Sequence, residues 1–179
     1  LYAHEPDAAA ATIPLAAAAG LVGCSIEDAT GNDADPIYPF DVAVRRVEAA
    51  VASARALAFP FTLTARAENL LHSRNDLDDT IRRLRAFEAA GADVLYAPGL
   101  QTMDQVRAVL AAVTKPVNIL VSTGNAHMTV AELSAAGAKR ISTGGAPARA
   151  ALGALIRAGR EMREHGTFTY GREAASFGE

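Results

Sequence analysis

Three segments of the chain repeat one pattern, in which an Ala-Gly pair is followed directly by an apolar stretch. The pairs are Ala19-Gly20, Ala90-Gly91 and Ala136-Gly137. Glycine is favoured just past the end of a helix because it adopts left-handed backbone angles without a Cβ clash. A short apolar run after such a turn is typical of a buried parallel strand. The repeat therefore predicts a chain in which helices and parallel strands alternate.

Five strands fit this alternation, near residues 21–26, 61–65, 94–96, 116–121 and 138–142. Five helices are predicted at residues 40–57, 77–90, 103–113, 129–136 and 147–164. In the second of these helices, Ile81, Leu84 and Phe87 recur at a spacing that places them on one face. Pro147 suits the first position of a helix. Thr129 with Glu132 has the spacing of a capping box.

The order of strands and helices implies right-handed crossovers and a parallel sheet, which is the α/β class. No G-x-G-x-x-G motif follows the first strand, so a (β/α) barrel is favoured over a nucleotide-binding sheet. A (β/α)8 TIM barrel has eight strands in about 250 residues, so the chain is predicted to hold about five βα units and to lack about three. A complete open sheet of five strands is the alternative.

We expect one domain over residues 1–179, in which residues 147–179 form a C-terminal helix and tail. The composition, 50% hydrophobic and 21% charged with a net charge of −3, is ordinary for a soluble globular protein and excludes a disordered chain. No apolar run reaches the roughly 20 residues of a membrane span. Without a basic cluster to meet phosphates, nucleic acid is not an expected partner. The single cysteine, Cys24, excludes an internal disulfide and fits the cytoplasm.

Candidate reactive residues follow the first two strands, because barrel enzymes carry their chemistry at the C-terminal ends of strands. Glu27 and Asp28 offer the carboxylate oxygens that Mg²⁺ prefers, although acids are also common where a helix or loop begins. Arg66 can bind a substrate carboxylate or phosphonate with two parallel hydrogen bonds. The alternative partner of Arg66 is a carboxylate of the chain itself, Glu27 or Glu68.

Further polar residues occur at the later strands. Asn118 lies within the fourth strand and offers a substrate-binding amide. The turn that begins at Ser142 and contains Gly144 precedes a helix, where backbone N–H groups can bind an anion. A simple tight turn explains the same residues. The long polar loop at residues 29–39 follows the candidate metal ligands and is either a lid over the site or a solvated connection.

Three motifs occur together in a fixed order: Gly-Cys-Ser-Ile-Glu-Asp at residues 23–28, Thr-Ala-Arg-Ala-Glu at residues 64–68, and Arg-Ile-Ser-Thr-Gly-Gly at residues 140–145. On these motifs the chain resembles the isocitrate lyase/phosphoenolpyruvate mutase superfamily, and in particular its short bacterial phosphonomutase-like members. The resemblance covers nearly the whole chain.

The resemblance implies a (β/α)8 barrel that binds Mg²⁺ and makes or breaks a C–C or C–P bond next to a small 2-oxo or 2-hydroxy acid. An enolate forms in such reactions, and the metal stabilises its charge. The resemblance assigns Glu27 to a metal-bound water, Arg66 to the anionic group of the substrate, and Asn118 to the mouth of the barrel. It also implies a homo-oligomer, a dimer or tetramer, in which subunits exchange the C-terminal helix.

The chain departs from the family pattern in three places. The Asp-rich metal motif of the family lies upstream of residues 1–6. Residues 31–35 replace the Lys-Arg-Cys-Gly-His loop of the lyases, which argues against cleavage of isocitrate or methylisocitrate. The mutase loop is not matched either. Three hypotheses follow: a Mg²⁺-dependent lyase that acts on a C–C bond, an enzyme of the phosphonomutase or phosphonopyruvate hydrolase type that acts on a C–P bond, and a non-catalytic barrel remnant or assembly subunit.

Overall fold

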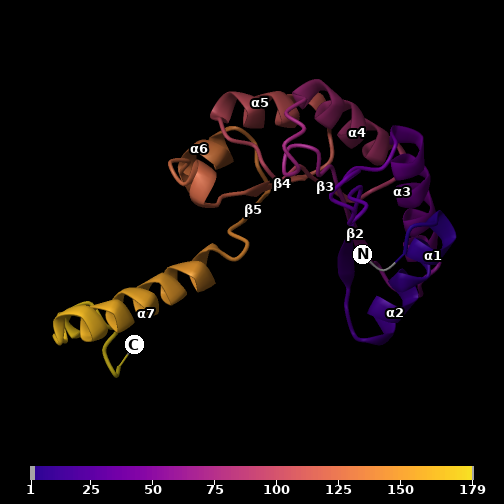
Figure 1. Cartoon of the computed structure of the whole chain (residues 1–179). Coiled ribbons are helices and arrows are strands. Elements are labelled where there is room, and N and C mark those ends of the chain that lie inside the picture. Colours follow the sequence, from indigo (N-terminus) through magenta and orange to yellow (C-terminus); the bar gives the residue numbers. More distant parts are fainter. Residues whose placement is uncertain (1–2, 179) are drawn as a thin grey trace. The chain divides into compact units, whose positions relative to one another are not determined.

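The computed structural model of the chain describes residues 3–178, and Leu1, Tyr2 and Glu179 lie outside this range. The chain divides into two compact units, the first ending at Ser142 and the second beginning at Thr143 (Figure 1). The first unit holds a parallel sheet with its helices. The second unit holds one long helix and a tail.

The sheet of the first unit contains five parallel strands in the order β1-β2-β3-β4-β5. They are β1 (Gly23–Glu27), β2 (Thr62–Arg66), β3 (Val94–Tyr96), β4 (Val117–Leu120) and β5 (Arg140–Ser142). The predicted α/β class and all five predicted strands are confirmed. The expected start of the first strand was two residues early, because pairing begins where Gly23 meets Thr62, and Leu21 and Val22 before it are exposed.

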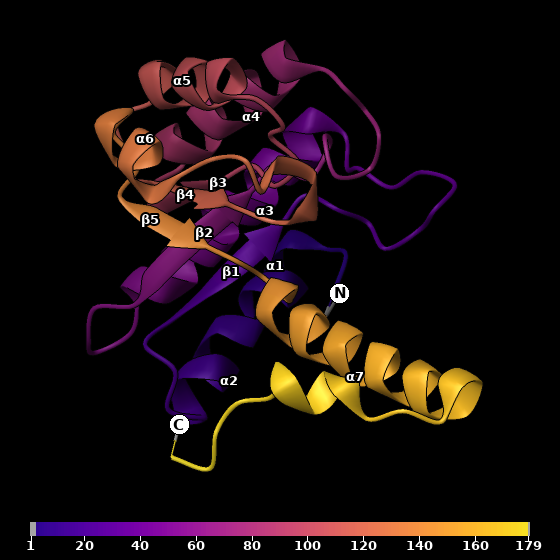
Figure 2. The same ribbon diagram turned by 90° about the vertical axis from the view of Figure 1, so that its left-hand side faces the viewer.

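Residues 3–178 form seven α-helices, of which two precede β1 and one follows each strand. They are α1 (Pro6–Ala10), α2 (Thr12–Ala18), α3 (Phe40–Arg55), α4 (Leu77–Ala89), α5 (Met103–Ala112), α6 (Val130–Ala135) and α7 (Ala146–His165), with short 3-10 turns at Thr123–Asn125 and Thr169–Arg172. Helices α3 to α6 lie side by side along the outer face of the curved sheet (Figures 1 and 2). The predicted capping box of Thr129 with Glu132 is confirmed, and Pro147 lies in the first turn of α7.

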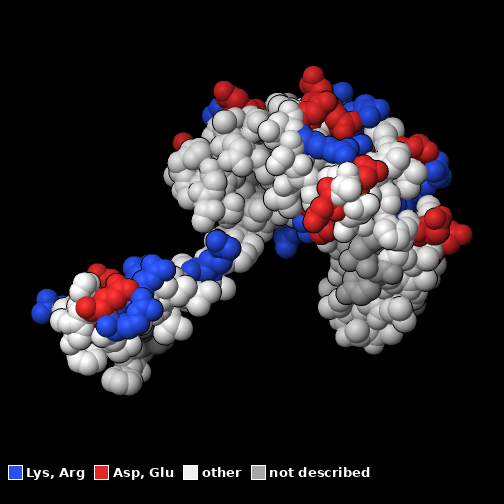
Figure 3. Space-filling view, viewed as in Figure 1, with Lys and Arg blue, Asp and Glu red and all other residues white. Residues whose placement is uncertain are grey.

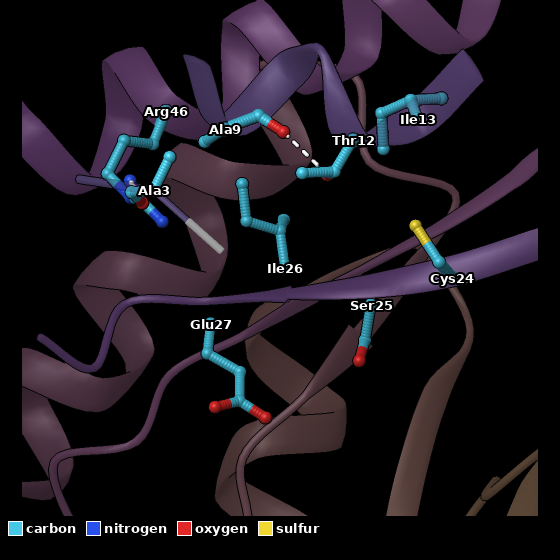
Figure 4. Close-up of a pocket in the computed structure, with 9 residues that line it drawn as sticks. All are labelled: Ala3, Ala9, Thr12, Ile13, Cys24, Ser25, Ile26, Glu27 and Arg46. Carbon is cyan, nitrogen blue, oxygen red and sulfur yellow. Dashed lines mark hydrogen bonds between the residues drawn. The ribbon is translucent and has the colours of Figure 1, made fainter. Parts of the chain in front are cut away.

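The two faces of the sheet have opposite chemistry, because side chains alternate along a strand. The face toward the helices carries Leu63, Ala65, Leu95 and Ile119, which are fully buried. Ala65, Leu95 and Ile119 pack in a core cluster with residues of α3, α4 and α5, and Leu63 packs in a second cluster with residues of α2 and α3. Figure 4 shows the alternation in β1, where two apolar side chains point toward the helices and Ser25 and Glu27 point to the opposite face.

The glycines of the repeated Ala-Gly pattern have the backbone conformation that the pattern predicts. Gly20, Gly91 and Gly137 have φ angles of 89°, 99° and 103°. A side chain at Gly91 would be strained by this angle, and its Cβ would lie 3.1 Å from a methyl carbon of Val51 in α3. The turn before β3 therefore requires glycine both for its backbone angle and for close packing on α3.

A buried ion pair joins the end of β1 to helix α4. Asp28 and Arg83 are only 3% and 6% exposed, and an Arg83 nitrogen lies 3.1 Å from a carboxylate oxygen of Asp28. The same nitrogen also donates to the backbone carbonyl of Tyr38, and Arg83 Nε donates to Asp79. The other oxygen of Asp28 accepts the backbone N–H of Glu68 at 2.7 Å. This network fixes the loops that follow β1 and β2 against each other.

The surface of the first unit mixes charges of both signs over the outer helices (Figure 3). Ion pairs such as Arg45–Asp41 and Arg107–Asp104 connect neighbouring turns of one helix. Within residues 3–178, no helix is both long enough and apolar enough to cross a membrane.

The second unit consists mainly of α7, in which Ala158 is the one buried residue. Leu155 and Ile156 are exposed, and the Glu161 carboxylate accepts hydrogen bonds from the turn at residues 167–170. The predicted exchange of residues 147–179 between subunits stays a prediction.

We expect Arg83→Ala to destabilise the fold by about 3–5 kcal/mol, because it leaves the buried Asp28 carboxylate without its counter-ion. Arg82→Ala is the matched control, since Arg82 is exposed and its ion pair with Asp79 contributes at most about 1 kcal/mol. Urea unfolding of both variants measures the difference.

The loss of unfolding free energy in Arg83→Ala, relative to the wild type, should shrink as the pH falls. Burial raises the pKa of the Asp28 carboxyl, so the folded variant takes up a proton at a higher pH than the unfolded chain does, and acid then favours the folded state. Equal stabilities of the two variants at neutral pH would contradict the role of the pair.

Candidate functional site

Five polar side chains form one row across the exposed face of the sheet. The strand register aligns them as neighbours, with one residue from each strand. In strand order, the row consists of Glu27, Arg66, Tyr96, Asn118 and Arg140. We call these five residues the polar row.

The face that carries the polar row is hollowed. A hollow of about 450 Å³ lies over β1 to β5, and four members of the row line it together with small polar side chains such as Ser25, Thr64 and Ser142. The walls of this hollow are therefore strand residues on a rigid sheet, which is a precise support for a binding site.

Arg66 is held from three sides. One of its terminal nitrogens lies 2.7 Å from a Glu27 oxygen, and its Nε lies 2.6 Å from a Glu68 oxygen. The guanidinium lies 4.8 Å from the centre of the Tyr96 ring, within the range of a cation–π contact. The predicted partnership of Arg66 with Glu27 or Glu68 is thus realised with both. The guanidinium is fixed in one orientation before any ligand binds.

The charges of this cluster favour an ionised arginine. Burial opposes the charge of Arg66, but the Glu68 hydrogen bond and the charges of Glu68 and Glu27 outweigh it and raise the pKa of Arg66. Burial also raises the pKa of the Glu68 carboxyl, although Arg66 pulls it down. Glu68 is 2% exposed, and its position follows from the bond between its backbone N–H and Asp28.

The two candidate metal ligands have different surroundings. The Glu27 side chain is 41% exposed, and Arg66 bonds to its Oε1. Both Asp28 oxygens are engaged, one by Arg83 and one by the Glu68 N–H. Among residues 3–178, no group of three or more His, Cys, Asp or Glu side chains is arranged to hold a metal ion. Metal binding by Glu27 and Asp28 stays a prediction.

Asn118 and Ser142 lie together on the far side of the hollow from Glu27. The Asn118 amide nitrogen lies 2.9 Å from the Ser142 hydroxyl. Asn118 is 1% exposed, and its amide oxygen has no hydrogen-bond partner among the described residues. Burial raises the pKa of the neighbouring Tyr96 hydroxyl. The third candidate here, Gly144, belongs to the second unit and is not placed relative to the hollow.

The loop at residues 29–39 is closed by its own backbone. Thr30 donates to the carbonyl of Pro36, and Tyr38 donates to that of Asp28. An exposed ion pair between Arg74 and Asp35 links it to the loop after β2. Its predicted role as a lid stays a prediction.

A second hollow, of about 250 Å³, lies on the helix side of β1, between β1 and helices α1 and α2 (Figure 4). Arg46 enters it, donates to the backbone carbonyls of Ala3 and His4, and lies 4.5 Å from the Tyr38 ring. Its role here is structural, because it joins α3 to the start of the described chain.

Two members of the polar row were not identified from the sequence. Tyr96 and Arg140 lie inside predicted strands, whereas the predicted site residues other than Asn118 lie at or beyond the strand ends. The missing signal was strand alternation: Arg140 lies two residues before Ser142, which places both on one face.

Comparison with known proteins identifies the family of the chain. The model of the phosphoenolpyruvate phosphomutase family matches residues 1–163. A solved structure from Burkholderia cenocepacia J2315, whose name assigns it provisionally to the lyases and mutases, is 56% identical, with a TM-score of 0.93 over 98% of this chain and 63% of that one. An oxaloacetate decarboxylase from Paraburkholderia xenovorans (strain LB400) is 35% identical over 55% of this chain and 34% of its own length.

A phosphonopyruvate hydrolase solved with oxalate and Mg²⁺ shares the fold, at 23% identity and a TM-score of 0.76 over 98% of this chain and 62% of that one. The chain thus spans between about one third and two thirds of the length of these relatives. The family match agrees with the five parallel strands of the sheet. This chain belongs to the phosphoenolpyruvate phosphomutase family, within the isocitrate lyase/phosphoenolpyruvate mutase superfamily.

Proposed function

We propose that the chain is the substrate-binding part of a Mg²⁺-dependent lyase that breaks or makes a C–C bond next to the carboxylate of a small 2-oxo or 2-hydroxy acid. The observation that carries the proposal is Arg66, which is held by Glu27, Glu68 and Tyr96 at the edge of a polar hollow. An oxaloacetate decarboxylase among the relatives supports C–C chemistry.

In this reaction the electron pair of the broken bond passes into an enolate, so negative charge grows on an oxygen beside the carboxylate. A guanidinium fixed beforehand binds the anionic end of the substrate with two parallel hydrogen bonds and needs little reorganisation as that charge grows. Glu27 and Glu68 fix the orientation of the Arg66 guanidinium, and the Tyr96 ring lies against its flat face. Asn118 and Ser142 supply neutral hydrogen-bonding groups across the hollow.

Mg²⁺ is supported as the cofactor by the relative solved with oxalate and Mg²⁺. When bound, the metal supplies a Lewis acid for the enolate charge. Glu27 is a suitable ligand for Mg²⁺ or for one of its waters, because Glu27 is partly exposed. Mg²⁺ keeps several waters in proteins and needs only one or two carboxylates. Asp28 fits less well, since Arg83 and the Glu68 N–H already engage its oxygens.

A C–P reaction is the second candidate, and the phosphomutase description of the matching family supports it. Arg66 would then bind a carboxylate or phosphonate in the same way. We also propose a homo-oligomer, for which the exposed apolar side chains of α7 are a candidate surface. The cytoplasm is the proposed compartment, since the single cysteine needs no oxidising environment.

Thermal unfolding with Mg²⁺ and oxalate tests the proposed function, because oxalate mimics a pyruvate enolate. At about 100 times its dissociation constant, a ligand stabilises the fold by about 2.7 kcal/mol. We expect a clear rise in Tm that requires both additives. No rise in a cooperatively folded sample would show that this chain alone does not form the site, as expected of a non-catalytic remnant.

Arg66→Ala should abolish the rise with oxalate and lower turnover by about 10²-fold or more, because the anionic group of the substrate loses its orientation. Arg45→Ala removes the same charge from the exposed face of α3 and is the matched control. Circular dichroism checks that both variants fold. Unchanged turnover in the Arg66 variant would remove this residue from the site.

Glu27→Gln should raise the Mg²⁺ concentration needed for half of the Tm rise by about 10–100-fold, as loss of a group that orients metal-bound water typically does. Asp33→Asn, in the exposed loop at residues 29–39, removes the same charge away from the hollow. A titration of MgCl₂ at fixed oxalate compares the two. Equal midpoints would assign Glu27 to holding Arg66 alone.

A further inference from the structure

A lyase of the proposed kind needs a proton donor besides a group that binds the anion. When the C–C bond breaks, its electron pair passes into an enolate, and a C–H bond must form at the enolate carbon before the product leaves. The donor must reach the hollow and must be acidic enough to give up a proton. Arg66 does not supply this proton, because a guanidinium keeps its protons in proteins.

Tyr96 meets both conditions. Among the described residues that line the hollow, it carries the one phenol, and a phenol has a pKa of about 10. The hydroxyls of Ser25, Thr64 and Ser142, which also line the hollow, are far weaker acids. The Cys24 thiol points to the helix side of β1 (Figure 4) and packs against the second core cluster. The phenol is therefore the acid that the sheet presents to a ligand.

Tyr96 lies directly beside the group that is proposed to bind the substrate. The register pairs it with Arg66 on the neighbouring strand, and the Arg66 guanidinium lies 4.8 Å from the centre of the Tyr96 ring. The carbons next to a carboxylate bound by Arg66 thus come within reach of the Tyr96 side chain. These are the carbons on which the enolate forms.

A chain of hydrogen bonds orients the phenol. The Asn118 amide nitrogen donates to the Ser142 hydroxyl at 2.9 Å. Burial raises the pKa of the Tyr96 hydroxyl, and a hydrogen bond with Ser142 acts against this rise. A bond that lowers the pKa of a phenol is one in which the phenol oxygen accepts. Tyr96 therefore receives a hydrogen from Ser142 and keeps its own O–H for another partner.

We propose that Tyr96 is a catalytic residue, the general acid that protonates the enolate carbon. The O–H bond of Tyr96 breaks, a C–H bond forms at the carbon from which the leaving group departed, and the phenolate regains a proton from solvent water. This inference rests on the proposed function, in which Arg66 binds the carboxylate. It gives the ring of Tyr96 and its hydroxyl separate tasks, since the ring contacts Arg66 and the hydroxyl meets the substrate.

Exchange of the methyl hydrogens of pyruvate for deuterium tests the proposal, because it requires proton transfer at the enolate carbon without C–C cleavage. Proton NMR in D₂O with MgCl₂ measures the loss of the methyl signal. Tyr96→Phe keeps the ring beside Arg66 and removes the hydroxyl, so exchange should slow by about 10²-fold or more, as expected for loss of a general acid. The Tm rise with Mg²⁺ and oxalate should persist in this variant, since oxalate has no carbon to protonate.

Two further variants sharpen the comparison. Tyr38→Phe removes the same hydroxyl from a tyrosine that bonds to His4 and does not line the hollow, and it should exchange pyruvate at the wild-type rate. Ser142→Ala removes the hydrogen bond to the phenol but leaves the acid in place, so its exchange should fall less than that of Tyr96→Phe.

The outcomes separate the two proposals. If Tyr96→Phe exchanges pyruvate at the wild-type rate, or if the wild type binds oxalate but exchanges pyruvate no faster than MgCl₂ alone, the role of Tyr96 is wrong, while the Tm rise still supports the proposed function. Loss of both exchange and the Tm rise in Tyr96→Phe would also contradict a role as the acid. If the wild type shows neither, the proposed function fails and the role of Tyr96 fails with it.

Discussion

The buried pair of Asp28 and Arg83 is the interaction on which the candidate site depends. Removing two charges from water is costly, and the cost is offset here because backbone groups and a second carboxylate complete the hydrogen bonds. Through its other oxygen, Asp28 fixes the backbone of Glu68, and Glu68 in turn holds Arg66. The orientation of the half-buried Arg66 guanidinium thus depends on an ion pair whose residues do not line the hollow.

Because side chains alternate along each strand, the apolar residues that stabilise the fold lie on one face of the sheet and the polar row lies on the other. One face of the sheet packs against the helices in two apolar core clusters. The opposite face carries the polar row, and its side chains need no large motion to meet a small ligand. Arg66 is held by strands on both sides and Arg140 by β4, so the positions of both residues follow from the register.

The sequence predicted the fold class, the five strands and the glycine turns, because these depend on local preference and period. It predicted that Arg66 pairs with Glu27 or Glu68, since all three follow strand ends. It did not reveal the partner of Asp28, because Arg83 lies 55 residues away and only packing brings them together. Tyr96 and Arg140 were missed because their role depends on register across four strand pairs.

The pairing of Glu27 with Arg66 also bears on how the sheet assembles. A slip of one residue between β1 and β2 turns every side chain of one strand to the other face. Glu27 would then meet the apolar core, where an unpaired charge is strongly unfavourable. The polar row therefore penalises misaligned strands during folding. Natural selection for a binding face and selection for correct strand alignment act here on the same two side chains.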